Sequence, residues 1–318
     1  MYEGFYGLRE RPFELTPNPR FLFMTARHRE ALTTLEYGLS ARTGVALLVG
    51  DAGTGKTTVV HAALQSQQAR QSRAVYLNNP SLTRTEFVEF LAAGFGLSAD
   101  AAKSKTRCLA ELTDMLLARH SAGVMSALII DEAQCLPDVL LEEVRLLANI
   151  ESASEKLLSI ILAGQPELAT RLNHPSLRQL KQRIGLRCSL APLTLAETTA
   201  YISARVRVAG GEASSLFTPD AVQLIHERSG GIPRTVSVIC DNAFVSGFAL
   251  DRRPIDRSIV LEVCTDFDFA EPAADTAAAD APAAPAYSPG SELPPNPAAP
   301  VANGLLRHLE KLRLPLRS

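Results

Sequence analysis

Short apolar runs alternate with longer amphipathic stretches over the first 192 residues of the chain. A continuous apolar run of strand length is typical of a strand that is buried on both faces of a sheet. Such runs are GVALLV (44–49), AVYLNN (74–79), ALIIDE (127–132), LLSIILAG (157–164) and LRCSLAP (186–192). Helical periodicity occupies the segments between them, as at 84–95, 109–120 and 139–150. This alternation predicts an α/β fold with a parallel five-stranded sheet over residues 1–192.

The pattern becomes helical after Pro192. Thr194 and Glu197 have the spacing of a capping box, in which each residue satisfies a backbone donor at the start of a helix. Amphipathic helical periodicity then continues to residue 267 without another strand-like run. Residues 193–267 are therefore predicted to form a small all-helical domain.

The last fifty residues change composition twice. Residues 268–303 are rich in alanine and proline, contain acidic residues and lack Lys, Arg and His, which predicts a disordered, extended acidic linker. Residues 304–318 are basic, and their leucines recur at helical spacing from Leu305 to Leu312. We expect a short amphipathic tail that docks into a partner groove or onto an anionic membrane surface, with an unstructured end as the alternative.

Composition excludes several classes of protein. The net charge of −2 gives no global electrostatic attraction to nucleic acid, although a local basic patch remains open. The five cysteines form no C-x-x-C pair, so we expect small buried thiols in a reducing compartment rather than disulfides or a zinc site. The N-terminus lacks the apolar core of a signal peptide, and no run of 18 apolar residues occurs. We therefore expect a cytoplasmic protein that reaches the inner membrane only by peripheral contact.

The stretch GDAGTGKTT follows the first predicted strand and opens a predicted helix. Gly50, Gly55, Lys56 and Thr57 occupy the fixed positions of G-x-x-x-x-G-K-[ST]. A glycine loop between a strand and a helix N-terminus directs backbone N–H groups toward a phosphate, whereas a plain glycine-rich turn is the alternative. Lys56 would reach the β- and γ-phosphates, and the Thr57 hydroxyl would be a ligand of Mg²⁺. The predicted phosphate-binding residues are Gly50, Asp51, Ala52, Gly53, Thr54, Gly55, Lys56, Thr57 and Thr58.

Polar side chains follow two further predicted strands. Asp131 and Glu132 end ALIIDE, and an acidic pair in this position beside a phosphate loop can serve Mg²⁺ and the attacking water. We assign Asp131 to Mg²⁺ and Glu132 to the general base, with a charged turn as the alternative. Gln165 follows the next strand and is expected to orient the lytic water with Glu132, unless it only starts a helix.

Arginines stand in two positions where oligomeric nucleotidases need positive charge. LRQLKQRIGLRC carries Arg178, Arg183 and Arg187 just before and within the fifth predicted strand. Arg183 is predicted to project into the nucleotide site of a neighbouring subunit, with Arg178 as the rival and a solvated helix face as the alternative. Arg234 begins a helix after GGIP, where the helix dipole disfavours a cation, so we expect a bound phosphate to be its partner.

Aromatic residues gather near the N-terminus. We expect most of them to cover an edge of the sheet, and one or two to line an adenine slot. They are Tyr2, Phe5, Tyr6, Phe13, Phe21 and Phe23.

The sequence resembles the AAA+ ATPases of the general secretion pathway protein A (ExeA-like) family over residues 1 to about 265. The resemblance is carried, in order, by MYEGFYGLRERPFELTPNPRFLF, GDAGTGKTT, IIDEAQ, LLEEVRLLANIES, LAGQPEL, LRQLKQRI and GIPR. It implies a P-loop NTPase (AAA+) fold with a helical lid, and ATP and Mg²⁺ as cofactors. It also implies Walker A at Gly50–Thr57, Walker B at Asp131 and Glu132, sensor 1 at Gln165, an arginine finger at Arg183 and sensor 2 at Arg234.

We therefore predict an ATP-hydrolysing enzyme that forms a homo-oligomer and drives assembly or remodelling of a secretion or cell-envelope system through a protein partner. Well-known secretion members of the family carry a transmembrane helix and a peptidoglycan-binding domain after the ATPase core, and we expect neither here. The alternative is an ATP-dependent DNA-binding regulator of the transposition target-selection type, which acts as a nucleotide switch. Glu132 favours turnover, because a switch can dispense with a general base.

Overall fold

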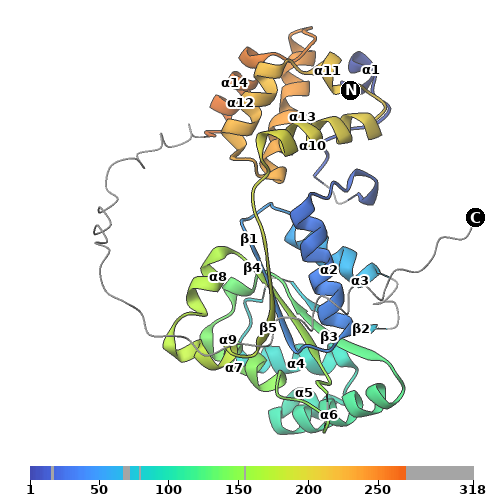
Figure 1. Cartoon of the computed structure of the whole chain (residues 1–318), viewed down its shortest axis with the longest axis vertical. Coiled ribbons are helices and arrows are strands. Elements are labelled where there is room, and N and C mark those ends of the chain that lie inside the picture. The colour runs from blue at the N-terminus through green and yellow to red at the C-terminus, as the bar shows by residue number, and fades with distance from the viewer. Residues whose placement is uncertain (16–17, 67–71, 79, 154, 270–318) are drawn as a thin grey trace, which may run out of the picture. The chain divides into compact units, whose positions relative to one another are not determined.

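The computed structural model describes residues 1–15, 18–66, 72–78, 80–153 and 155–269 (Figure 1). The predicted acidic linker, apart from its first two residues, and the predicted amphipathic tail lie outside these ranges. Within them, no helix is both long and apolar enough to cross a membrane.

Within the described residues, five parallel strands form one sheet, as predicted. They are ordered β2-β3-β4-β1-β5, and every neighbouring pair is parallel. Their bounds are β1 (Val45–Gly50), β2 (Ser72–Leu77), β3 (Met125–Ile130), β4 (Ser159–Gly164) and β5 (Ile184–Leu190). The prediction placed Asp131 and Glu132 inside a strand, whereas β3 ends at Ile130, so that both acids lie just beyond the carboxyl edge of the sheet.

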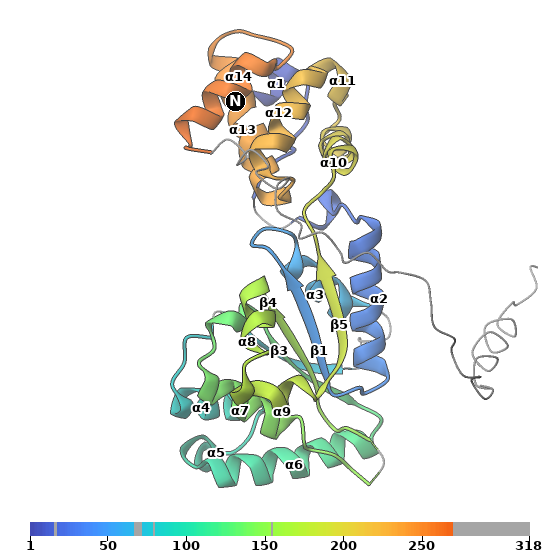
Figure 2. The ribbon, with the colours of Figure 1, turned by 60° about the vertical axis from the view of Figure 1, so that its left-hand side comes forward.

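Helices cover both faces of the sheet (Figure 2). Alternation along β1 explains the two layers, because Leu47 and Val49 enter one hydrophobic core while Ala46 and Leu48 enter the other. The helices on one face are α2 (Ala26–Ser40) and α3 (Lys56–Gln65). Those on the other face are α4 (Arg84–Phe95), α5 (Ala99–Lys103), α6 (Lys105–Ser121), α7 (Asp138–Leu147), α8 (Pro166–Arg171) and α9 (Arg178–Lys181).

The region after β5 is helical, as the sequence predicts. It contains α10 (Leu195–Val208), α11 (Ala213–Leu216), α12 (Pro219–Ser229), α13 (Pro233–Ala249) and α14 (Arg257–Asp266). The capping box is present, since the Thr194 hydroxyl accepts from the Glu197 N–H at 3.2 Å and Glu197 accepts from the Thr194 N–H at 2.9 Å. These helices surround a third hydrophobic core that is separate from the two cores of the sheet.

The N-terminal aromatics belong to this third core, so the expectation that they cover an edge of the sheet is wrong. Tyr2 precedes the short helix α1 (Glu3–Tyr6) and Tyr6 is its last residue, and together with Phe13 they are almost fully buried. Their rings lie 5.3, 4.7 and 6.0 Å from the ring of Phe244 on α13. Phe244 offers a large apolar surface inside the helical region, and the aromatic rings gain burial and ring contacts by packing around it. The division of the chain into domains at residue 192 stays a prediction. The aromatic residues Tyr2, Tyr6 and Phe13 nevertheless pack in the core of the helical region, although they precede this boundary.

Replacing Phe244 with alanine is expected to destabilise the protein by about 3–5 kcal/mol, because the cavity would remove contacts to several rings at once. The free energy of unfolding, measured by urea denaturation, checks this value. Phe267→Ala is the matched control, since Phe267 is 48% exposed and its loss should cost far less. Equal losses for the two variants would contradict the assignment of Phe244 to the centre of this core.

Candidate active site

A glycine loop joins the carboxyl end of β1 to the start of α3 at Lys56. Gly53 and Gly55 both adopt left-handed backbone angles, with φ of 82° and 97°. A Cβ atom on Gly53 would lie 2.8 Å from Cβ of Arg234, and one on Gly55 would lie 3.2 Å from Nε2 of His28. Glycine is therefore required here both by conformation and by space. The loop leads directly into a helix N-terminus, whose first N–H groups have no partner within the helix.

The Lys56 side chain is held by the loop that surrounds it. The residue is 4% exposed, and its Nζ donates to the Gly50 carbonyl at 2.7 Å and to the Asp51 carbonyl at 3.0 Å. Burial lowers the pKa of Lys56, while the carboxylates of Glu132 and Asp131 act in the opposite direction and favour its charged form. The ammonium group is thus a positive charge fixed within the glycine loop.

The first turn of α3 meets the end of β3 through a hydrogen bond. The Thr57 hydroxyl donates to Oδ2 of Asp131 at 2.6 Å, and Oδ1 of Asp131 accepts from the Glu132 N–H at 2.9 Å. Asp131 is 1% exposed, whereas Thr57 is exposed. A hydroxyl and a carboxylate side by side are hard oxygen donors of the kind that Mg²⁺ prefers, so this pair fits the predicted metal.

A tyrosine that the sequence did not single out touches the same carboxylate. Tyr76 lies on β2 opposite Ile129 of β3, and its hydroxyl donates to Oδ2 of Asp131 at 2.7 Å. Burial, and then the hydrogen bond to Asp131, raise the pKa of Tyr76, so its hydroxyl remains protonated and acts as a donor. The Tyr76 ring stacks on His61, with centroids 5.1 Å apart and planes at 17°. A tyrosine within a strand is typical of ordinary packing, which is why its sequence position carried no signal.

Two glutamine side chains hold Glu132. Its carboxylate accepts from Nε2 of Gln134 at 2.5 Å and from Nε2 of Gln165 at 3.4 Å. Oε1 of Gln134 in turn accepts from the Gln165 N–H at 3.0 Å. The structure therefore brings the two predicted residues together and inserts Gln134 between them. Gln134 stood in the quoted IIDEAQ motif, but nothing in its spacing assigned it a contact.

The backbone of Glu132 is in the left-handed region, with φ of 51° and ψ of 37°. A residue with a side chain pays about 1–2 kcal/mol for this conformation, and such strain concentrates at functional sites. The conformation turns the chain sharply after Asp131 and leaves the carboxylate of Glu132 facing Gln165.

A buried histidine supports the glycine loop from α2. Nε2 of His28 lies 2.9 Å from the Thr54 carbonyl, and Nδ1 lies 2.7 Å from the Thr25 hydroxyl. An Nε2–H donor to the Thr54 carbonyl, with Nδ1 accepting from the Thr25 hydroxyl, satisfies both contacts. His28 was also missed, since a single histidine in an amphipathic helix has no distinctive spacing.

Arg234 reaches the glycine loop through its backbone. It lies in the first turn of α13, and its N–H donates to the Gly53 carbonyl at 3.3 Å. The residue itself is exposed. The helical region therefore contacts the loop directly, at the residue where the sequence predicted a phosphate partner.

Arg183 is not close to the glycine loop of its own chain. It precedes Ile184, the first residue of β5, whereas the loop follows the last residue of the parallel strand β1. β5 has seven residues and spans about 20 Å, so Arg183 and the glycine loop lie at opposite ends of the strands. Arg183 is exposed and lines a cavity of about 410 Å³ with Arg145, Gln179 and Gln182.

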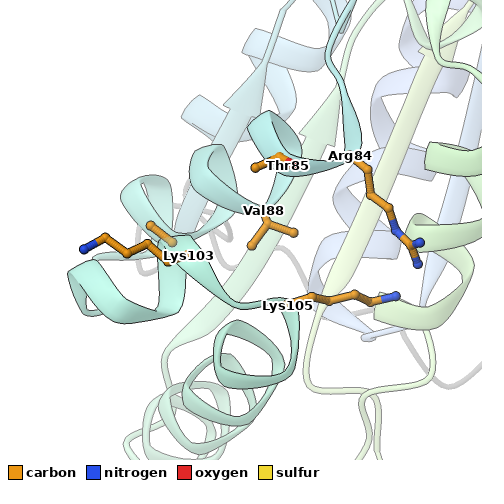
Figure 3. Close-up of a pocket in the computed structure, with 6 residues that line it drawn as sticks. Arg84, Thr85, Val88, Lys103 and Lys105 are labelled. Carbon is orange, nitrogen blue, oxygen red and sulfur yellow. The ribbon is translucent and has the colours of Figure 1, made fainter.

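A second group of basic residues lies on α4 to α6, beside a cavity of about 270 Å³. Figure 3 shows that Arg84 and Lys105 extend to one side, whereas Lys103 extends to the other. Arg84 and Lys105 both form ion pairs with the buried carboxylate of Glu143 on α7. These charges tie three helices together and do not converge on the cavity.

The sheet has the order β2-β3-β4-β1-β5, with a glycine loop after β1 and an acidic pair after β3, on the far side of β4. Together with the helical region that follows the sheet, these features define a P-loop NTPase of the AAA+ class. Residues 40–172 match the family described as AAA domain. Two relatives and one solved structure are similar to this chain over most of its length.

General secretion pathway protein A of Aeromonas hydrophila is 44% identical over 249 residues, which are 78% of this chain and 45% of that protein. The chain thus spans less than half the length of this relative. Mu-like prophage FluMu DNA transposition protein B of Haemophilus influenzae is 29% identical over 227 residues, 69% of this chain and 71% of that protein. The Aeropyrum pernix ORC2 protein has a similar fold, with a TM-score of 0.60 at 17% identity over 81% of this chain and 71% of that structure.

Proposed function

We propose that the protein binds ATP together with Mg²⁺ and hydrolyses it at the loop of residues 50–58. One observation carries the proposal: Asp131, bonded to the Thr57 hydroxyl, and Glu132, bonded to Gln165, both act electrostatically on the ammonium group of Lys56. Release of inorganic phosphate from ATP by the unaltered protein tests it directly, since a protein that only binds the nucleotide would release none.

Each of these residues has a separate task in the proposed reaction. Lys56 and the N–H groups of the loop hold the β- and γ-phosphates, and Thr57 and Asp131 hold Mg²⁺, which neutralises phosphate charge when bound. Glu132 accepts a proton from the attacking water, and Gln165 orients that water. Gln134 keeps the carboxylate of Glu132 directed toward Gln165, and His28 fixes the Thr54 carbonyl of the loop. Arg234 is proposed to sense the phosphate from the helical region.

We propose in addition that the active form is a homo-oligomer in which Arg183 serves a neighbouring subunit. Arg183 lies too far from the loop of its own chain to act there directly. It is exposed at the opposite end of the strands, where it can reach the nucleotide site of another copy. A guanidinium group that reaches the transferring phosphate stabilises the charge that develops on it.

Arg183→Ala is expected to bind ATP normally and to lose about a thousandfold or more in hydrolysis rate. Mixing it with Lys56→Ala should restore part of the activity, because hybrid assemblies then contain sites with both an intact loop and an intact arginine. Phosphate release from the separate and mixed variants measures this. Arg178→Ala is the comparison that decides between the two candidate arginines. Activity per subunit that is independent of protein concentration, with no rescue on mixing, would count against an arginine acting between subunits.

The cellular role that we propose is to drive assembly or remodelling of a secretion or cell-envelope system through a protein partner, from the cytoplasm and by peripheral contact with the inner membrane. The name and the 44% identity of the Aeromonas relative support this direction. The alternative of an ATP-dependent DNA-binding regulator that acts as a nucleotide switch is not favoured, because the relative named for DNA transposition is only 29% identical over a smaller part of the chain. Residues 304–318 are proposed to supply the contact with the partner or membrane, and deletion of these residues should then reduce recruitment without changing hydrolysis.

A further inference from the structure

We infer that Tyr76 is a positioning residue for the magnesium-binding carboxylate, and that its hydroxyl sets the affinity of the nucleotide site for Mg²⁺. The inference rests on the proposed function, since it concerns the same site. It adds a residue from β2, a strand that carries none of the predicted nucleotide or metal contacts.

The first line of support is the geometry around one oxygen atom. Oδ2 of Asp131 accepts two hydrogen bonds, at 2.6 Å from Thr57 and at 2.7 Å from Tyr76. Oδ1 accepts from the Glu132 N–H, so the carboxylate is fixed at both oxygens. Asp131 is almost fully buried, so these hydrogen bonds take the place of water around its carboxylate.

The second line of support is how the fold directs Tyr76 to this place. Tyr76 pairs with Ile129, which lies two residues before Asp131, so the two side chains emerge from the same face of adjacent strands. That face is covered by α3, on which Thr57 and His61 are four residues apart and therefore neighbours on one side of the helix. His61 stacks on the Tyr76 ring and so holds the hydroxyl beneath Thr57.

The consequence follows from how a ligating carboxylate behaves. Thr57 would hold a bound cation through its hydroxyl oxygen, and the Tyr76 hydroxyl, on the neighbouring strand β2, would remain the donor that keeps Asp131 in place. Hydrogen-bond partners of metal ligands typically change metal affinity by about 10–100-fold when they are removed. The aromatic ring of Tyr76 supplies packing, and the single hydroxyl supplies this orientation.

Tyr76→Phe separates the two contributions, because it removes the hydroxyl and keeps the ring. Binding of a fluorescent ATP analogue is titrated with Mg²⁺ and, separately, in excess EDTA. We expect the Mg²⁺ concentration at half-maximal stimulation of binding to rise about tenfold or more, while the affinity in EDTA stays unchanged. Tyr37→Phe is the matched control, since Tyr37 lies on α2 and is 57% exposed, and it should titrate like the unaltered protein.

A double-mutant cycle distinguishes a specific effect of the Tyr76 hydroxyl on Asp131 from a general loss of stability in the variant. In an Asp131→Asn background, Tyr76→Phe should have no further effect on the Mg²⁺ midpoint, because the carboxylate that it orients has gone. Additive effects of the two changes, or an unchanged midpoint in Tyr76→Phe alone, would overturn the inference. If the unaltered protein bound the analogue without any response to Mg²⁺, the proposed function itself would fail, and the two failures are thereby distinguished.

Discussion

Replacing Lys56 with alanine is expected to weaken ATP binding by about 10–100-fold and to reduce hydrolysis to background. Charge-assisted hydrogen bonds contribute about 1.5–3 kcal/mol each, which is the origin of that range. The Lys56 ammonium is buried in the loop and bonded to two of its carbonyls, so it is fixed where the β- and γ-phosphates are expected. Calorimetric titration with ATP, together with phosphate release, measures both effects.

Lys103→Ala is the control for the loss of a lysine. Lys103 is exposed on α5 and points away from the ion pairs that hold this region, so its removal should change neither binding nor hydrolysis. Full ATP affinity in Lys56→Ala would mean that the loop of residues 50–58 does not bind the phosphates.

Glu132→Gln is expected to retain ATP binding and to hydrolyse ATP about 10²–10⁴ times more slowly, since only the general base is lost. Glutamine has the same shape and can still accept the hydrogen bonds from Gln134 and Gln165 through its carbonyl oxygen. ATP affinity and the single-turnover hydrolysis rate are measured on the same preparation. The affinity should stay close to that of the unaltered protein while the rate falls.

Glu167→Gln controls for the change of charge near the site. Glu167 lies on α8, is exposed and acts on Lys56 only through its field, so its replacement should leave the rate close to that of the unaltered protein. If Glu132→Gln hydrolysed ATP at the unaltered rate, another group would have to be the base.

The parallel sheet and the alternation of its strands with helices were predictable because each element has a pattern in its own local sequence. Each strand is a continuous apolar run, and each glycine of the loop is required by a backbone angle or by a close neighbour, so the pattern is visible without tertiary information. The acidic pair was predictable for the same reason, although the strand ends at Ile130, before both acids, and not at residue 132. The meeting of Glu132 and Gln165 followed from the rule that parallel strands end at one edge.

Other parts of the site depend on contacts between segments that are far apart in the sequence. The partner of the Tyr76 hydroxyl lies 55 residues away, and His28 bonds to a carbonyl 26 residues away. Neither side chain differs in its local sequence from one that only packs. The prediction for the N-terminal aromatic residues was wrong for the same reason. An apolar ring can fill any hydrophobic core, and only the position of Phe244 decides which core these rings enter.

Phosphate release from ATP by the unaltered protein, measured against Lys56→Ala in the same preparation and with Mg²⁺ present, is the most direct test of ATP hydrolysis at this loop. We expect repeated turnover that stops when Mg²⁺ is removed by EDTA and that rises per subunit with protein concentration. Phosphate release by the unaltered protein no faster than by Lys56→Ala, under conditions where ATP is bound, would contradict it.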